Sequence, residues 1–207
     1  MRPVLRWRIL VPIFFSIILL GITFNLQKVF SLLSLGNGYG QITGIQAYDF
    51  DLVNEKGHRV RLHDYHSTPV YLFFGFTKCQ GVCPINMQIF LQLAQALNKD
   101  TKQAEFLFIS IDPIRDNTVA LNEFVLNYSG YIHALGTGVD TTQKVANEFK
   151  NYYSYEKDKI KDDKNHQIQH NGFIYLIGKN DQLITVYPQR QLDVERLKQD
   201  FLALDRE

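Results

Sequence analysis

The chain has 207 residues, of which 45% are hydrophobic and 21% are charged, and its formal net charge is +1. This composition is that of a globular protein and excludes the disordered and fibrous classes. A nearly balanced charge gives no whole-molecule field that would attract nucleic acid, so we expect no nucleic-acid partner. The length suits one domain with an extension.

The N-terminus has the pattern of a membrane anchor. Arginines precede an almost entirely apolar run over residues 9–24. Extended to Leu26, the run reaches about 18 residues, the short end of membrane-spanning helices. No small-residue cleavage site follows it, so we expect an uncleaved transmembrane helix within residues 1–30. Arginines before the run, and only Lys28 soon after it, predict a cytoplasmic N-terminus and a single-pass protein of the inner (cytoplasmic) membrane with its domain outside.

A glycine-rich stretch at residues 36–40 predicts a flexible linker over residues 31–45. The remaining residues, 46–207, are expected to form one domain whose elements follow from hydrophobic periodicity and turn residues. In chain order these elements are a hairpin (49–53 and 59–62), a strand (70–76), a helix (85–97), a strand (105–111), a helix from Asp116 or Asn117 to Tyr128, a helix from a capping box at 140–143 to about Tyr153, a strand (172–177), its antiparallel partner (183–187) and a closing helix (193–204).

This order favours an α/β layer structure with a mixed sheet. We therefore expect thioredoxin-like topology with an N-terminal β-hairpin, preceded by one transmembrane helix. Residues 154–169 are rich in Lys and Asp without apolar periodicity, which indicates a solvated loop. In the first helix, the apolar stripe expected to face the sheet consists of Ile85, Ile89, Leu93 and Leu97.

The chain has two cysteines, Cys79 and Cys83, between the strand at 70–76 and the helix that follows. Backbone N–H groups and the helix dipole stabilise thiolates at a helix start, so we expect both thiols to be partly activated. Positions i and i+4 share one face of a helical turn, so the two sulfurs can converge on one ion or form a disulfide. A purely structural disulfide explains them poorly, because the shortest loops gain least from cross-linking.

Thiolates are soft ligands for Cu(I), zinc or iron–sulfur centres, and two of them need a further donor. His166 and His170 are candidates, because they close the polar loop directly before the strand at 172–177. From the residues alone, either could ligate or could be a solvated loop residue. The other histidines are expected to have surface or packing roles: His58, His63, His66 and His133.

Three sequence blocks follow one another along the domain. FGFTKCQGVCP occupies residues 74–84, IDPIRD occupies 111–116, and QHN at 169–171 precedes an apolar strand. Together they resemble the Sco/SenC family of copper chaperones, in which the first block has the form F-G-[FY]-T-x-C-x-x-x-C-P. The similarity covers roughly residues 48–204. A lone C-x-x-x-C is a weak signal, whereas three blocks in order are specific.

The resemblance implies a copper-binding protein that helps to build the dinuclear copper site of cytochrome c oxidase. By motif position, Cys79, Cys83 and His170 would be the metal ligands. We select His170 over His166 for a further reason, since the strand that follows His170 fixes its backbone. The implied partners are the copper-binding subunit of the oxidase, a copper donor protein and a thiol reductant.

Two acidic residues, Asp112 and Asp116, match family positions near the site, although turn or helix-cap chemistry explains them equally well. Other positions depart from the family pattern, where histidine, proline or an acidic residue is common. Without acidic neighbours, we expect weaker Cu(II) binding and intact Cu(I) binding. The departing residues are Lys78, Gln80, Gly81 and Gln169.

An alternative function is that of a membrane-anchored thiol-disulfide oxidoreductase acting on cysteines of an oxidase subunit or another exported protein. Either Cys79 or Cys83 would then attack and the other would resolve the mixed disulfide. A peroxidase is less well supported, because the sequence has no distant second cysteine. The short anchor without an Arg- and Ser-rich presequence favours a bacterial membrane over a mitochondrial one.

Overall fold

The computed structural model describes residues 41–204 except 100–102, 129, 164 and 190–191. The expected anchor at residues 1–30 lies outside the described residues. Within the part that is described, no helix is long and apolar enough to cross a membrane.

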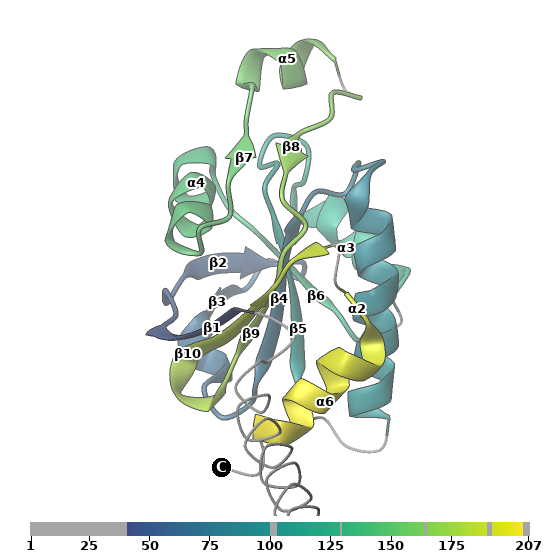
Figure 1. Ribbon diagram of the computed structural model, residues 1–207. Coiled ribbons are helices and arrows are strands. Elements are labelled where there is room, and N and C mark those ends of the chain that lie inside the picture. Colours follow the sequence, from purple (N-terminus) through teal and green to yellow (C-terminus); the bar gives the residue numbers. More distant parts are fainter. Residues whose placement is uncertain (1–40, 100–102, 129, 164, 190–191, 205–207) are drawn as a thin grey trace, which may run out of the picture. The chain divides into compact units, whose positions relative to one another are not determined.

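The centre of the domain is a mixed sheet of eight strands in the order β1-β10-β9-β4-β5-β6-β2-β3 (Figure 1). Strands β4, β5 and β6 are parallel, and every other neighbouring pair is antiparallel. The strands are β1 (Gln41–Gln46), β2 (Asp51–Asn54), β3 (Arg59–Arg61), β4 (Val70–Gly75), β5 (Glu105–Ser110), β6 (His133–Gly136), β9 (Ile174–Ile177) and β10 (Gln182–Tyr187).

Helices cover both faces of this sheet, with α2, α3 and α6 on one side and α4 on the other (Figure 1). A separate two-stranded sheet joins β7 to β8. The remaining elements are α2 (Val82–Asn98), α3 (Thr118–Leu126), α4 (Val139–Glu148), α5 (Lys157–Asp162), α6 (Val194–Leu204), β7 (Tyr153–Ser154), β8 (Gln169–His170) and the 3₁₀ helices η1 (Leu62–Tyr65) and η2 (Lys179–Asp181).

Strand β4 divides the core, because successive side chains of a strand point to opposite faces. Leu72 and Phe74 belong to the core under α4, whereas Tyr71 and Phe73 belong to the core under α2 and α6. All residues of β4 are buried, as the continuous apolar run predicted for a central strand. The cysteine loop therefore starts from a fully buried strand that is paired on both sides.

The predicted architecture is confirmed in its main parts. The N-terminal hairpin, the two central strands, the antiparallel pair β9 and β10, and the closing helix all form at the expected positions. Asn117 caps α3, since its side-chain oxygen accepts a hydrogen bond from the Ala120 N–H at 3.0 Å. The fold is thus the mixed α/β, thioredoxin-like arrangement that the element order indicated.

Two helix details differ from the prediction. Helix α4 begins after Gly138 without a side-chain cap, so the expected capping box at 140–143 is wrong. It also ends at Glu148 rather than near Tyr153, and Lys150 just beyond it has a positive φ of 54°. A non-glycine residue in this region does not continue a right-handed helix.

The buried face of α2 is rotated relative to the predicted stripe. Ile85 is 62% exposed and Ile89 is partly buried, whereas Leu93 and Leu97 are in the core as expected. The helix begins at Val82, so its first turn contributes Cys83 to the buried face. The helical period predicts the spacing of the buried residues but not which residue starts the buried face. The predicted stripe was counted from Ile85, the first isoleucine after Pro84.

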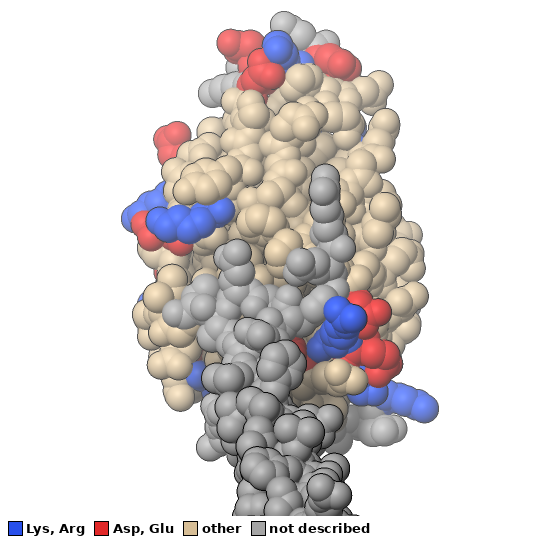
Figure 2. Space-filling view, in the orientation of Figure 1, with Lys and Arg blue, Asp and Glu red and all other residues tan. Residues whose placement is uncertain are grey.

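The segment predicted as a solvated loop, residues 154–169, is instead a folded arm of β7, α5 and β8. Its charged residues of described burial are exposed, namely Glu156, Asp158, Lys159 and Asp163. Figure 2 shows acidic and basic groups gathered at the end formed by α5. Ile160 and Ile168 are nevertheless buried in the core under α4. Two isolated isoleucines in a charged segment show no periodicity, so the sequence did not predict that this arm is folded.

Strand formation also extends beyond the predicted set at two places. The linker expected over residues 31–45 overlaps β1, which pairs with β10 at the edge of the sheet. Strand β6, which begins at His133, lies between β5 and β2. Both strands are short or rich in small residues, so neither has a clear alternating pattern.

Candidate metal site

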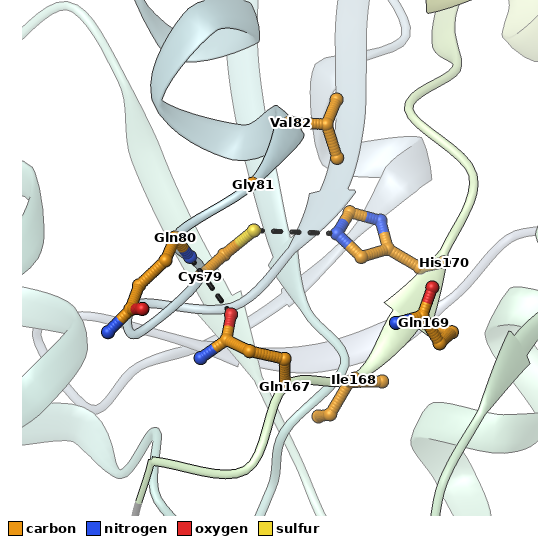
Figure 3. A pocket seen from close by; sticks show the side chains of 8 residues that line it. All are labelled: Cys79, Gln80, Gly81, Val82, Gln167, Ile168, Gln169 and His170. Carbon is orange, nitrogen blue, oxygen red and sulfur yellow. Dashed lines mark hydrogen bonds between the residues drawn. The ribbon is translucent and has the colours of Figure 1, made fainter.

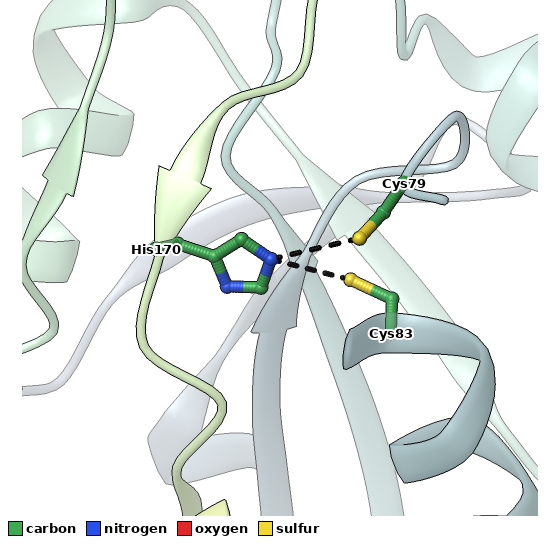
Figure 4. A group of neighbouring side chains, drawn as sticks. All are labelled: Cys79, Cys83 and His170. Atoms are coloured by element: carbon green, nitrogen blue, oxygen red, sulfur yellow. Dashed lines mark hydrogen bonds between the residues drawn. The ribbon is translucent and has the colours of Figure 1, made fainter. Parts of the chain in front are cut away.

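The two cysteines and one histidine meet at the C-terminal end of β4 (Figure 4). Cys79 lies in the loop after this strand, and Cys83 lies in the first turn of α2. His170 ends the short strand β8, which leads into β9 beside β4. His170 thus faces Cys83 and Cys79, although it follows them by 87 and 91 positions in the sequence.

The three side chains point at a common centre. The His170 Nε2 atom lies 3.4 Å from the Cys83 sulfur and 3.8 Å from the Cys79 sulfur. Their ligand atoms all lie within 4.8 Å of one another. In the described part of the chain, this is the only group of three or more Cys, His, Asp or Glu side chains with that geometry.

The His170 ring is oriented by its other nitrogen. Nδ1 lies 2.6 Å from the backbone oxygen of Asn171, so an N–H at Nδ1 donates to this carbonyl. That tautomer leaves the lone pair of Nε2 directed at the two sulfurs, as in a metal-ligating imidazole. The rings of Phe73 and Phe76 pack against the imidazole with centroids at 6.5 and 5.9 Å, which restricts its rotation.

The two thiols are electrostatically unequal. A hydrogen bond from the Cys83 S–H, supported by backbone N–H groups of Cys83 and Gly81, lowers the pKa of Cys79 to about 4. The same bond, together with burial and the negative charge on Cys79, raises the pKa of Cys83. The prediction that both thiols are activated is therefore wrong for Cys83, because two adjacent thiolates repel each other in a buried site.

Close packing under the cysteines requires Gly75. A Cβ atom at this position would lie 2.9 Å from the Cys83 sulfur and 2.8 Å from the Phe108 ring. Any side chain here would push α2 away from the sheet. The glycine of the FGF sequence therefore sets how near the Cys83 thiol approaches β4.

A second close approach joins α2 to the segment after His170. A Cβ atom on Gly172 would lie 2.6 Å from a Val82 methyl group. The buried Asn86 side chain donates to the Gly172 carbonyl at 2.9 Å. The first turn of α2, which contains Cys83, is thus tied to the backbone two residues beyond His170.

The Asp112 side chain is not a ligand but the partner of a buried ion pair. Its carboxylate accepts a hydrogen bond from Arg115, and both side chains are almost fully buried. The guanidinium also donates to the His166 carbonyl at 2.8 Å and lies over the Phe76 ring. Asp112 therefore acts through Arg115, which fixes the base of the arm before β8.

Asp116 holds the start of the cysteine loop. Its carboxylate accepts hydrogen bonds from the Thr77 backbone N–H at 3.0 Å and the Thr77 hydroxyl at 2.6 Å. The Ser110 hydroxyl donates to it at 2.6 Å. Burial raises the pKa of Asp116, although these three donors oppose that shift. Asp116 is thus neither a ligand nor the cap of α3, a role that Asn117 fills.

The structure separates the two histidine candidates. His166 contributes its backbone carbonyl to Arg115, and its ring Nε2 lies 3.9 Å from a Glu156 oxygen. It is not part of the cluster around the sulfurs. The remaining histidines also lie outside this cluster: His58, His63, His66 and His133.

A pocket of about 430 Å³ opens beside the sulfur of Cys79 and the ring of His170 (Figure 3). No Asp, Glu, Lys or Arg side chain lines it. Its lining consists of Cys79, Gln80, Gly81, Val82, Gln167, Ile168, Gln169 and His170. The site is therefore reached from solvent on the side of Cys79, whereas Cys83 is only 3% exposed.

Sequence reasoning missed the polar residues that support the ligands. Asn86, Arg115 and Gln167 all bond to backbone groups of segments distant in the sequence. No local pattern marks Asn86 or Gln167, which are of residue types common on surfaces. Arg115 stands in the IDPIRD block, but its bond to the His166 carbonyl becomes visible only in the folded chain.

The unequal thiols give a testable pH dependence. In the reduced full-length chain in detergent, the rate of Cys79 alkylation by iodoacetamide should stay constant down to about pH 5, because the thiolate is the nucleophile. Replacing the hydrogen-bond donor, Cys83→Ala, should move this fall in rate to higher pH. Peptide mass spectrometry gives the rate at each cysteine, and the denatured chain is the control. A Cys79 rate that rises only near the ordinary thiol pKa of about 8.5 would contradict the shared-proton arrangement.

Comparison with known proteins places this site in a family. The SCO1/SenC family model matches residues 42–204. The SCO2-like protein of Rickettsia felis is 28% identical over 132 residues, which cover 64% of each chain. The human mitochondrial protein SCO1 homolog is 30% identical over 145 residues, covering 69% of this chain and 47% of the human one. The match thus spans less than two thirds of the length of these relatives.

A solved structure supports the fold assignment. The copper-bound ScoI of Bradyrhizobium japonicum superposes with a TM-score of 0.65 at 22% identity, covering 77% of this chain and 98% of that one. The family model covers most of the chain, including the cysteine loop and the histidine strand. The chain belongs to the SCO1/SenC family.

Proposed function

We propose that this chain is a copper-binding chaperone that delivers copper to, or prepares, the dinuclear copper site of cytochrome c oxidase. The observation that carries the proposal is the convergence of two sulfurs and one imidazole nitrogen within 4.8 Å at an open pocket. Soft thiolates with an imidazole suit Cu(I). Family membership and the copper bound in a solved relative support the same cargo.

The arrangement of the three ligands suits transfer by ligand exchange. Cys79 and His170 line the pocket, whereas Cys83 lies behind them in the first turn of α2. An incoming thiolate would reach the ion from the pocket and displace Cys79 or His170 first. Cys83 would hold the ion until the last step, because its sulfur is shielded from solvent.

The alternative, a thiol-disulfide oxidoreductase, is supported by the lowered pKa of Cys79. A partly exposed thiolate beside a second thiol has the form of an attacking and resolving pair. Copper binding explains more of the site, because disulfide exchange requires no imidazole in contact with both sulfurs. The oxidase subunit, a copper donor and a thiol reductant are the partners that this function requires.

We also propose that residues 1–30 anchor the chain in the inner (cytoplasmic) membrane, with the domain on the extracytoplasmic side. The basic start and the apolar run support this topology. A linker would then connect the anchor to the domain. Strand β1 begins at Gln41, so the linker would end before this residue.

The anchor proposal predicts the behaviour of shortened chains. A chain that begins at Tyr39 should leave the membrane fraction, fold and remain monomeric by circular dichroism and gel filtration. A chain that begins at Ala47 should unfold at lower temperature and associate, because loss of β1 leaves β10 as an open sheet edge. Aggregation of the longer version, or its retention in membranes, would contradict the assigned boundaries.

Copper stoichiometry tests the function itself. The reduced full-length chain in detergent should bind one equivalent of Cu(I), measured by competition with a chelator. Cys79→Ser and Cys83→Ser should each abolish stoichiometric binding and keep the circular dichroism spectrum, because the free thiols do not cross-link the fold. Negligible copper binding by the unaltered chain, together with a reversible disulfide, would instead identify the oxidoreductase.

A pair of histidine variants tests the third ligand. His170→Ala should lose most Cu(II) affinity and the sulfur-to-copper charge-transfer absorption, since Nε2 of His170 is the nitrogen that faces both sulfurs. Weak Cu(I) binding by the two thiolates should remain. The matched control is His166→Ala, which should change little because this ring lies outside the cluster. A larger loss of copper affinity in His166→Ala than in His170→Ala would show that His170 is not the third ligand.

A further inference from the structure

The side chain of Gln167 bonds to the backbone on both sides of Cys79. Its Oε1 accepts a hydrogen bond from the Gln80 N–H at 3.0 Å (Figure 3). Its Nε2 donates to the Lys78 carbonyl at 3.2 Å and to the Asn165 carbonyl at 2.9 Å. A primary amide has one acceptor oxygen and two N–H donors, so this residue type satisfies all three contacts.

This amide connects the two segments that contain the ligands. Gln167 lies three residues before His170, and the backbone groups that it binds belong to the residues before and after Cys79. The segment between β4 and α2 is a turn without ladder hydrogen bonds to a neighbouring strand. The sulfur position of Cys79 therefore depends on contacts of this kind.

The other cysteine is tied to the histidine segment at a different point. Asn86 of α2 donates to the Gly172 carbonyl, two residues after His170. This bond fixes the helix that contains Cys83. Loss of the Gln167 contacts would therefore release Cys79 from His170 and leave Cys83 in place.

We propose that Gln167 is a positioning residue that holds the Cys79 thiol against the His170 imidazole, an inference that rests on the proposed copper-binding function. It acts through the backbone and contacts no metal itself. Outer-shell residues of this kind change metal affinity by about 10- to 100-fold when they are replaced. The two cysteines lie in one chain segment, so disulfide formation does not require the bridge.

The test compares Gln167→Leu with Gln169→Leu in the full-length chain in detergent. Leucine has no amide and no sulfur that could bind Cu(I). Gln169 lines the same pocket and is exposed, so its replacement controls for changes in the pocket surface. We expect Gln167→Leu to weaken Cu(I) binding by about 10- to 100-fold and to alter the Cu(II) charge-transfer band. Gln169→Leu should change neither property, and the rate of disulfide formation should be unchanged in both variants.

Partial rescue distinguishes positioning from general stability. Gln167→Glu retains the acceptor for the Gln80 N–H and loses the donor to the Lys78 carbonyl. It should give a copper affinity between those of the unaltered chain and Gln167→Leu. Equal loss in both variants with a matching fall in thermal stability and in the disulfide rate would overturn the positioning role.

Two measurements on the copper-free chain separate this proposal from the function on which it rests. By NMR, hydrogen exchange of the Gln80 amide should be faster in Gln167→Leu than in Gln169→Leu, and the ¹⁵N shift of His170 Nε2 should change only in Gln167→Leu. If the unaltered chain binds no copper but both changes occur, the chaperone function fails and the positioning role stands. Unchanged Gln80 exchange, or full copper affinity in Gln167→Leu, overturns the positioning role.

Discussion

The site depends on the antiparallel pairing of β9 with β4. Phe73 of β4 lies opposite Ile174 at the start of β9. In an antiparallel pair one strand begins where the other ends, so residues just before β9 meet residues just after β4. His170 and Cys79 are such residues, which is why positions 91 apart in sequence come within 3.8 Å. The parallel neighbour β5 supplies no residue to this contact, but it buries β4 and keeps its end rigid.

Strand pairing brings the segments together, and buried polar contacts then fix their ends. Asp116 holds Thr77 at the exit of β4, and the Asp112–Arg115 pair holds the backbone of His166 before β8. A buried charge is costly unless it is paired or hydrogen-bonded, so such groups specify one arrangement of the loops rather than add much stability. The acidic residues of the second sequence block thus serve the site without touching the ligand atoms.

Most of the fold and the three side chains of the candidate metal site could be predicted from the sequence, but most of the polar contacts that hold these side chains could not. Apolar runs and turn residues predicted β4, β5, β9 and β10, because these features are local. His170 could be chosen over His166 only from its place before β9 and from the family resemblance. The roles of Gln167 and Asn86 could not be predicted, since an amide side chain that bonds to a distant backbone group has no sequence pattern that distinguishes it from an amide on the surface. The arm at residues 153–170 was misread for a similar reason, because Ile160 and Ile168 find their core only in three dimensions.

The unequal thiols follow from the same geometry. Cys83 is held by α2 against Gly75 and is buried, which raises the pKa of Cys83 and favours the negative charge on Cys79. A bound cation would displace the proton of Cys83 and pair both sulfurs with positive charge. The rest of the pocket lining adds no carboxylate, which is the harder donor that Cu(II) would recruit. The donor set therefore matches the softer Cu(I), and its accessible ligands lie on the side where the metal would leave.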